Sequence, residues 1–146
     1  ALTGKQNLKV MAAAGGIPDS RVDEVLELVE LTEAANKRTK NYSLGMKQRL
    51  ALAGAILGDP EVLILDEPAN GLDPLGIAWL RKFLRSLAGS GRTILVSSHQ
   101  LAEMQNTVDD VIIMHKGKLI TSGSMKEIIK EGTLEEAFLK LTEGVN

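Results

Sequence analysis

Residues 58–74 read GDPEVLILDEPANGLDP, and this stretch decides the fold. Its centre, residues 62–65, is a short apolar run that is typical of a strand covered on both faces of a sheet. A second run of this kind, residues 93–96, follows a segment with helical spacing that begins at Pro74. The order strand, helix, strand predicts a right-handed crossover unit of a parallel sheet, and therefore an α/β fold.

Helical spacing predicts three helices before the first strand. The first is N-capped by Thr3, and the second begins at Ser20 and fades through residues 34–36. The third helix is N-capped by Ser43 and runs to about Leu57.

Smaller elements are expected after the second strand. The spacing predicts a short helix near residues 101–105 and a β-hairpin whose turn lies at residues 115–118. Ser124 and Thr133 each stand three residues before a glutamate, a capping-box pattern that predicts two further short helices.

The composition excludes several classes of protein. The 146 residues are 44% hydrophobic and 25% charged, which is normal for a globular domain and not for a disordered chain. No apolar stretch reaches the roughly 18 residues of a membrane helix, and the absence of cysteine excludes thiol chemistry. A net charge of −2 and 3% aromatic residues argue against a nucleic-acid binder. These features favour a cytoplasmic protein.

Two adjacent acids, Asp66 and Glu67, follow the first apolar run. In parallel sheets, chemistry sits at the carboxyl ends of the strands. A hydrated Mg²⁺ is a natural partner for one carboxylate, and the second could orient or deprotonate a water. A solvated acid pair without function is the alternative.

An imidazole, that of His99, follows the second strand after two serines. It could donate to a phosphate oxygen or position a water molecule. Taken alone, it could equally be an ordinary surface or capping histidine.

The third helix begins with a hydroxyl, Ser43, and a glycine, Gly45. Free N–H groups and partial positive charge gather at a helix N-terminus, which suits a phosphate. Gly45 would let such a ligand approach closely. The plainer interpretation is a serine-capped amphipathic helix.

Three stretches together carry a family resemblance: YSLGMKQR at residues 42–49, GDPEVLILDEPANGLDP at 58–74 and TILVSSH at 93–99. The chain resembles the ATPase subunits of ABC transporters, with the signature helix, Walker B strand, D-loop and switch histidine in family order. The YSLGMKQR and NGLDP variants resemble exporter ATPases that pair with ABC-2-type membrane subunits, including multidrug-resistance systems.

The resemblance implies a role for each matching residue around ATP and Mg²⁺. Asp66 matches the Walker B aspartate, which holds Mg²⁺ through water, and Glu67 the catalytic carboxylate that polarises the attacking water. His99 matches the switch histidine at the γ-phosphate. Asp73 matches the D-loop aspartate, which acts across a dimer interface.

The signature positions are implied to contact ATP bound by the opposing subunit. They are Ser43, Leu44, Gly45 and Met46. Leu44 stands where a second glycine is usual in the family, and Met46 where glutamine is usual. Ser43 and Gly45 keep the usual residue types, so contact with phosphate remains expected.

No G-x-x-x-x-G-K-[ST] phosphate-binding loop occurs in the sequence. We therefore expect the C-terminal part of an ABC ATPase, an α/β P-loop NTPase core whose P-loop half is absent. The resemblance implies a helical signature subdomain over residues 1–58, the later half of the core over 59–123, and C-terminal helices over 124–146.

The implied function is that of a fragment, inactive alone, of a subunit that hydrolyses ATP. The intact subunit would form a homo- or heterodimer and drive transport, with export expected, through an ABC-2-type permease. It would lie on the cytoplasmic face of the membrane and bind no nucleic acid. The alternatives are a non-catalytic module with the cassette shape and a cassette ATPase of DNA repair or translation.

Overall fold

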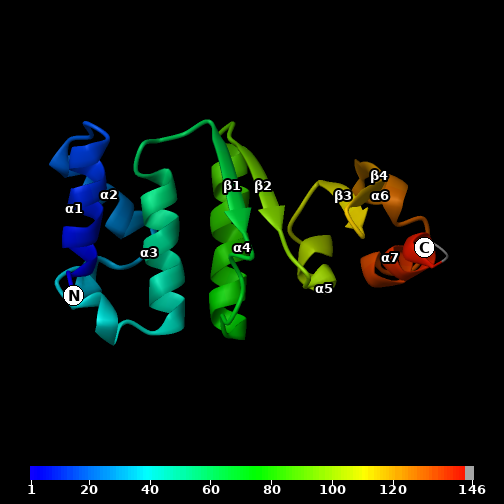
Figure 1. Cartoon of the computed structure of the whole chain (residues 1–146), viewed down its shortest axis with the longest axis horizontal. Coiled ribbons are helices and arrows are strands. Elements are labelled where there is room, and N and C mark those ends of the chain that lie inside the picture. Colours follow the sequence, from blue (N-terminus) through cyan, green and yellow to red (C-terminus); the bar gives the residue numbers. More distant parts are fainter. Residues whose placement is uncertain (144–146) are drawn as a thin grey trace. The chain divides into compact units, whose positions relative to one another are not determined.

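A computed structural model describes residues 1–143 of the chain. The chain forms two compact units, Ala1–Ser97 and a second unit that begins at Ser98. The first unit contains three helices followed by a strand–helix–strand unit (Figure 1). Its elements are α1 (Gly4–Ala14), α2 (Asp19–Leu28), η1 (Thr32–Ala34), η2 (Thr39–Asn41), α3 (Leu44–Ile56), β1 (Val62–Asp66), α4 (Pro74–Gly89) and β2 (Thr93–Ser97).

The parallel pairing of β1 with β2 confirms the α/β prediction from residues 58–74. α4 connects the two strands, and its N-cap is Asp73, whose Oδ1 accepts from the N–H of Gly76 at 2.7 Å. Pro74 occupies the first turn, where its missing N–H costs nothing.

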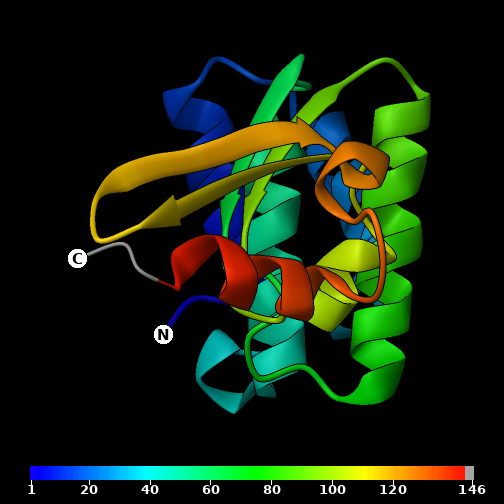
Figure 2. The ribbon, with the colours of Figure 1, turned by 90° about the vertical axis from the view of Figure 1, so that its right-hand side faces the viewer.

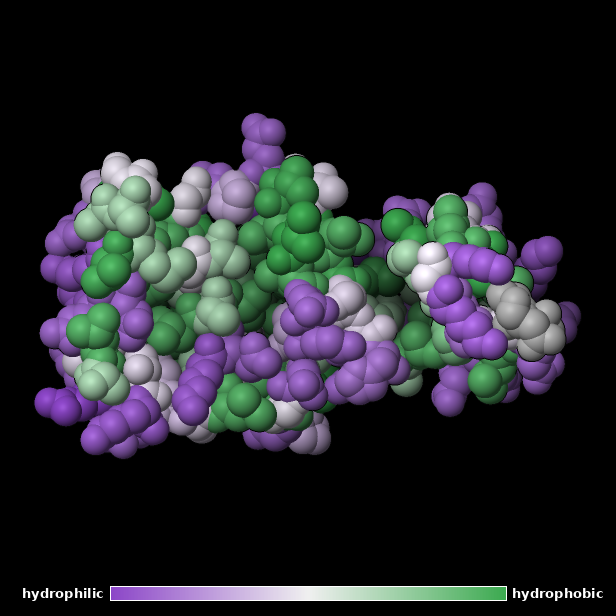
Figure 3. All heavy atoms as spheres, in the orientation of Figure 1, coloured by the Kyte–Doolittle hydropathy of each residue, from purple (hydrophilic) through white to green (hydrophobic). Residues whose placement is uncertain are grey.

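One prediction about these strands was wrong, because the sheet is not covered on both faces. Leu63 and Leu65 are buried with α4, but the alternate residues Val62 and Ile64 are 57% and 74% exposed. Leu95 of β2 is 51% exposed. Nothing in the described part of the chain packs over this face, and Figure 3 shows hydrophobic atoms gathered over the two strands.

The helices before β1 pack around a shared core. Thr3 forms the predicted capping box of α1, and Ser43 caps α3 as expected. The largest fully buried side chains of these helices come from all three of them: Leu8, Val22, Val25, Leu26 and Ile56. In α2 the apolar residues at helical spacing are buried as predicted, whereas in α1 Leu8 is buried and Val10 and Met11 are exposed.

The predicted bounds of α2 were wrong at both ends. Pro18 is the N-cap, and Ser20 lies inside the first turn without a capping hydrogen bond. The helix ends at Leu28 because Glu30 adopts a left-handed φ of 58° and the Leu31 N–H closes onto the Leu26 carbonyl at 2.8 Å. Ala34 is the last residue of a separate 3₁₀ turn, η1, and residues 35–36 follow that turn.

The second unit confirms the predicted small elements. They are α5 (Leu101–Gln105), β3 (Asp110–His115), β4 (Lys118–Ser124), α6 (Met125–Ile128) and α7 (Leu134–Thr142). β3 and β4 form the antiparallel hairpin (Figure 2), and Ser124 and Thr133 form the two capping boxes. In residues 1–143, no helix is both long enough and apolar enough to cross a bilayer.

Candidate functional site

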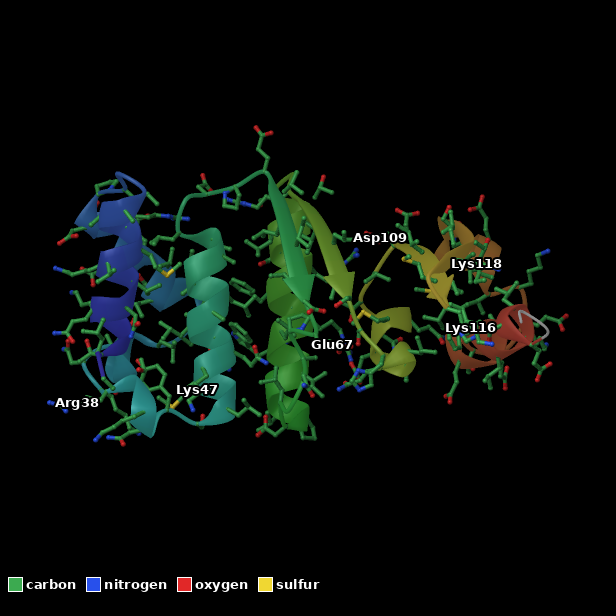
Figure 4. The ribbon with its side chains drawn as sticks, viewed as in Figure 1. Arg38, Lys47, Glu67, Asp109, Lys116 and Lys118 are labelled. Atoms are coloured by element: carbon green, nitrogen blue, oxygen red, sulfur yellow. The ribbon has the colours of Figure 1, made fainter. Side chains whose placement is uncertain are left out.

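The carboxyl ends of β1 and β2 bring Asp66 and Glu67 to one edge of the sheet, where Figure 4 labels Glu67. Asp66 pairs in register with Ser97, the last residue of β2, and the Ser97 hydroxyl donates a hydrogen bond to Oδ1 of Asp66. The backbone N–H of Glu67 donates to the carbonyl oxygen of Ser97 at 3.1 Å and to its Oγ at 3.0 Å. Ser97 therefore joins the two acidic residues.

The backbone of Glu67 is in a strained conformation. Its φ is 47°, in the left-handed region that a residue with a β-carbon rarely adopts. Such a conformation costs of order 1–3 kcal/mol and persists only where surrounding bonds impose it. Here the Glu67 carbonyl accepts from the N–H of Asn70 at 3.1 Å, and Ser97 holds the Glu67 N–H. The strain fixes the direction of the chain directly after the strand.

The donor set at this edge fits a Mg²⁺ held largely by water and phosphate. Asp66 is exposed, and the hydrogen bond that it accepts from Ser97 uses one of its two carboxylate oxygens. Within the described residues, no group of three or more acidic, histidine or cysteine side chains could enclose a metal. Mg²⁺ commonly binds to one or two carboxylates together with waters and substrate phosphates. Asp66 fits that mode of binding and not an all-protein cage.

The N-terminus of α3 exposes the predicted phosphate-contacting residues. Ser43 Oγ accepts from the N–H of Met46 at 3.1 Å, and both Ser43 and Leu44 are exposed. A Cβ on Gly45 would meet only Leu72 Cδ2 at 3.6 Å and Ser43 Oγ at 4.0 Å, which are ordinary contacts. Packing within the chain therefore does not require a glycine at this position.

The first residue of the YSLGMKQR stretch, Tyr42, belongs to the core. It is 5% exposed, and its hydroxyl donates to the Ala34 carbonyl at 2.7 Å. Burial raises the pKa of Tyr42 above its ordinary value of 10.0. The tyrosine ring also fills the space beside Gly4, where a Cβ would lie 2.1 Å from the hydroxyl. The exposed part of the stretch begins at Ser43.

A hollow of about 450 Å³ lies between the N-termini of α3 and α4. Trp79 of α4 lines it, with its ring stacked on Phe83 at 5.0 Å between centroids. Its lining includes the residues that the resemblance assigns to the signature and the D-loop, but neither Glu67 nor His99: Ser43, Leu44, Gly45, Met46 and Asp73.

The surroundings of the α3 N-terminus are strongly basic. Residues 34–58 contain no acidic residue and five basic ones, namely Lys37, Arg38, Lys40, Lys47 and Arg49. Figure 4 labels Lys47, which lies on the first turns of α3, and Arg38, which lies at the outer edge of the molecule away from that helix end. Arg49 is paired with Glu30, whereas Lys47 lies on the first turns of α3 and forms no ion pair within residues 1–143, so its charge favours an anionic ligand at the helix N-terminus.

His99 lies in the second unit, just before α5. Its side chain is exposed, and the neighbouring Ser98 Oγ accepts from the N–H of Gln100 at 3.0 Å. A role together with Asp66 and Glu67 stays a prediction.

Two residues important for the geometry received no role from the sequence. Ser97 stood in the sequence beside His99, and only the strand register revealed that it meets Asp66. Arg49 donates to the Val29 carbonyl at 3.1 Å and to Glu30 at 2.7 Å, and its guanidinium lies 3.9 Å from the Trp79 ring centroid. Arg49 thus joins the end of α2 to α4 through α3, a role that residue spacing does not indicate.

Comparison with known proteins agrees with the geometry. A family model described as "ABC transporter" matches residues 2–70. The bacitracin transport ATP-binding protein BcrA of Enterococcus faecalis is 47% identical over 131 residues, covering 88% of this chain and 42% of that protein. The lantibiotic transport ATP-binding protein SrtF of Streptococcus pyogenes is 39% identical over 137 residues, covering 94% of this chain and 58% of that protein.

Solved structures show the same fold. The structure of an ATP binding subunit of an ABC transporter superposes with a TM-score of 0.84 at 29% identity, over 97% of this chain and 62% of that one. CbiO1 from Clostridium perfringens, part of the ABC transporter complex cbiONQ, gives a TM-score of 0.79 at 31% identity, over 99% and 59%. The chain thus spans about half the length of the proteins it matches.

The mixed α/β fold and these matches define the class of protein. The chain belongs to the ATP-binding proteins of ABC transporters, and it is similar to the bacitracin and lantibiotic transport members.

Proposed function

We propose that the intact protein hydrolyses ATP as a dimer and drives export through an ABC-2-type membrane permease. The observation that carries this proposal is the strand-end arrangement in which Ser97 joins Asp66 to a Glu67 held at a φ of 47°. BcrA and SrtF are named as transport ATP-binding proteins, and these names support a role in transport.

Each residue has a stated task in this proposal. Asp66 holds Mg²⁺ through water, and the ion supplies charge neutralisation to the phosphates when it is bound. Glu67 accepts the proton of the attacking water. Its backbone conformation sets the position from which the carboxylate meets that water. His99 donates a hydrogen bond to the γ-phosphate.

The α3 N-terminus contacts the ATP of a second subunit, either another copy or a related chain. The hydroxyl of Ser43 and the N–H of Gly45 supply hydrogen-bond donors at the start of the helix, next to the basic residue Lys47. Asp73 acts from the adjacent N-terminus of α4 across the dimer interface. The division of the chain into residues 1–58, 59–123 and 124–146 is part of this proposal. The phosphate-binding loop is supplied by another part of the intact protein. The intact protein lies at the cytoplasmic face of the membrane.

Steady-state ATP hydrolysis by the full-length protein tests the assignment of the base. Glu67→Gln should lower turnover by about 10²–10⁴-fold while ATP binding persists, because a general base contributes this much and the amide cannot accept the proton. Glu61→Gln is the matched control, since Glu61 is an exposed carboxylate just before the opposite end of β1. Unchanged turnover in Glu67→Gln would show that another group is the base.

A further inference from the structure

The loop between β1 and α4 packs against the N-terminus of α3, and one of its contacts lies at Gly71. This residue has a φ of 74°, and a Cβ there would lie 2.1 Å from Leu44 Cδ2 and 3.3 Å from Leu44 Cγ. The left-handed backbone favours glycine at position 71, and a larger residue there would also displace the end of the Leu44 side chain from its present place.

Further contacts hold the loop on both sides of Gly71. Gln48 Nε2 of α3 donates to the Asn70 carbonyl at 3.2 Å. On the other side, Leu72 Cδ2 reaches the space beside Gly45, 3.6 Å from where a Cβ would be. The first turns of α3 thus contact the loop on both sides of Gly71, at Asn70 before it and at Leu72 after it.

The same loop begins at the strained glutamate and ends at the cap of α4. The Asn70 N–H donates to the Glu67 carbonyl at 3.1 Å, and the Leu72 N–H donates to the Ala69 carbonyl at 3.1 Å. Two residues after Gly71, Asp73 caps α4. These hydrogen bonds connect the segment that contacts α3 with Glu67 at one end and with Asp73 at the other.

We propose that Leu44 is a positioning residue that fastens the α3 N-terminus to the Gly71 loop, so that Ser43 and Asp73 present themselves to a second subunit as one rigid surface. This inference rests on the proposed function. It also gives a reason for leucine at a position where the resemblance leads one to expect glycine. Compared with glycine, leucine at position 44 restricts the backbone at the start of α3, and its side chain fixes the distance between α3 and Gly71.

Dimerisation of the full-length protein in ATP, measured by analytical ultracentrifugation in a Glu67→Gln background, tests the inference. Slow hydrolysis in that background keeps ATP bound during the measurement. Leu44→Ala should weaken the ATP-dependent dimer by about tenfold, a usual size for coupling between sites. Its melting temperature should stay within about 3 °C of the parent, because Leu44 is 53% exposed and contributes little to the core.

Leu75→Ala is the matched control. Leu75 lines the same hollow and is 81% exposed, but it does not contact the glycine. It should dimerise like the parent. Leu44→Met should also dimerise like the parent, because methionine keeps the volume and the reach of the side chain.

A double-mutant cycle tests the contact itself. Gly71→Ala should impair dimerisation in the parent and impair it less in Leu44→Ala, because the clash disappears while the backbone strain remains. Unchanged dimerisation of Leu44→Ala, an equal loss in Leu75→Ala, or strict additivity in the cycle would each overturn the positioning role. A parent that fails to dimerise in ATP would overturn the proposed function as well, so the two failures are distinguishable.

Discussion

At the start of α3, Gly45 could carry a methyl group without disturbing its own chain, since the nearest atoms would be 3.6 and 4.0 Å away. Gly45→Ala should therefore leave the free energy of unfolding unchanged or raise it by up to about 1 kcal/mol, because alanine has a higher helix propensity than glycine. We expect the same variant to lose ATP-dependent dimerisation, because the methyl group would stand where phosphate approaches. Urea unfolding and sedimentation in ATP measure the two effects, and a dimer of normal affinity would contradict the phosphate contact.

Tyr42 is the only tyrosine in the chain, so tyrosinate absorbance reports on it alone. Tyr42→Phe should cost about 1 kcal/mol, because the Ala34 carbonyl loses one of its two donors and keeps only the Lys37 N–H. The raised pKa of Tyr42 means that the unfolded chain ionises first. This contribution to stability is complete below pH 10 and is lost as the pH rises from there through the folded pKa.

The stability of the wild type should therefore fall more steeply than that of Tyr42→Phe above about pH 10. Denaturant titrations at several pH values, paired with the absorbance titration, measure this difference. Parallel stability curves for the two proteins at high pH would mean that Tyr42 titrates as it does in an unfolded chain.

At the scale of elements, the N-cap of α3 has two separable tasks. Ser43→Ala should destabilise the protein by about 1 kcal/mol through the lost bond to the Met46 N–H. It should also weaken ATP-dependent dimerisation by about 1.5–3 kcal/mol if the hydroxyl bonds a charged phosphate. Ser43→Asn keeps a good cap, so it should restore the unfolding free energy without restoring the dimer. Recovery of both properties in Ser43→Asn would reduce Ser43 to a helix cap.

The elements that local chemistry specifies were predictable. Capping boxes at Thr3, Ser124 and Thr133 need only residues three apart, and all three helices begin there. The end of α2 was not predictable in this way. It depends on the left-handed Glu30 and on Arg49, which reaches the Val29 carbonyl from another helix. A bond between residues twenty apart leaves no periodic signal in the sequence.

At the scale of the whole molecule, the uncovered sheet face is an association hazard. Exposed apolar side chains on a two-stranded sheet with open edges invite pairing with another chain. The 146-residue chain should therefore self-associate, and Ile64→Lys should reduce light scattering at high concentration. Val10→Lys is the control, since Val10 is 60% exposed on α1, away from the strands. Equal scattering by both variants would place the association elsewhere.

The class of fold could be predicted from the sequence, because apolar periodicity and helix caps are local features, and the family could be predicted from the resemblance of residues 42–49, 58–74 and 93–99 to its motifs. Tertiary structure alone decided that Ser97 meets Asp66, that one face of the sheet is bare, and that Leu44 presses on Gly71. The reason is physical. Each of these facts depends on which atoms of distant segments come within a few ångströms of one another, and strand register and side-chain packing set those distances.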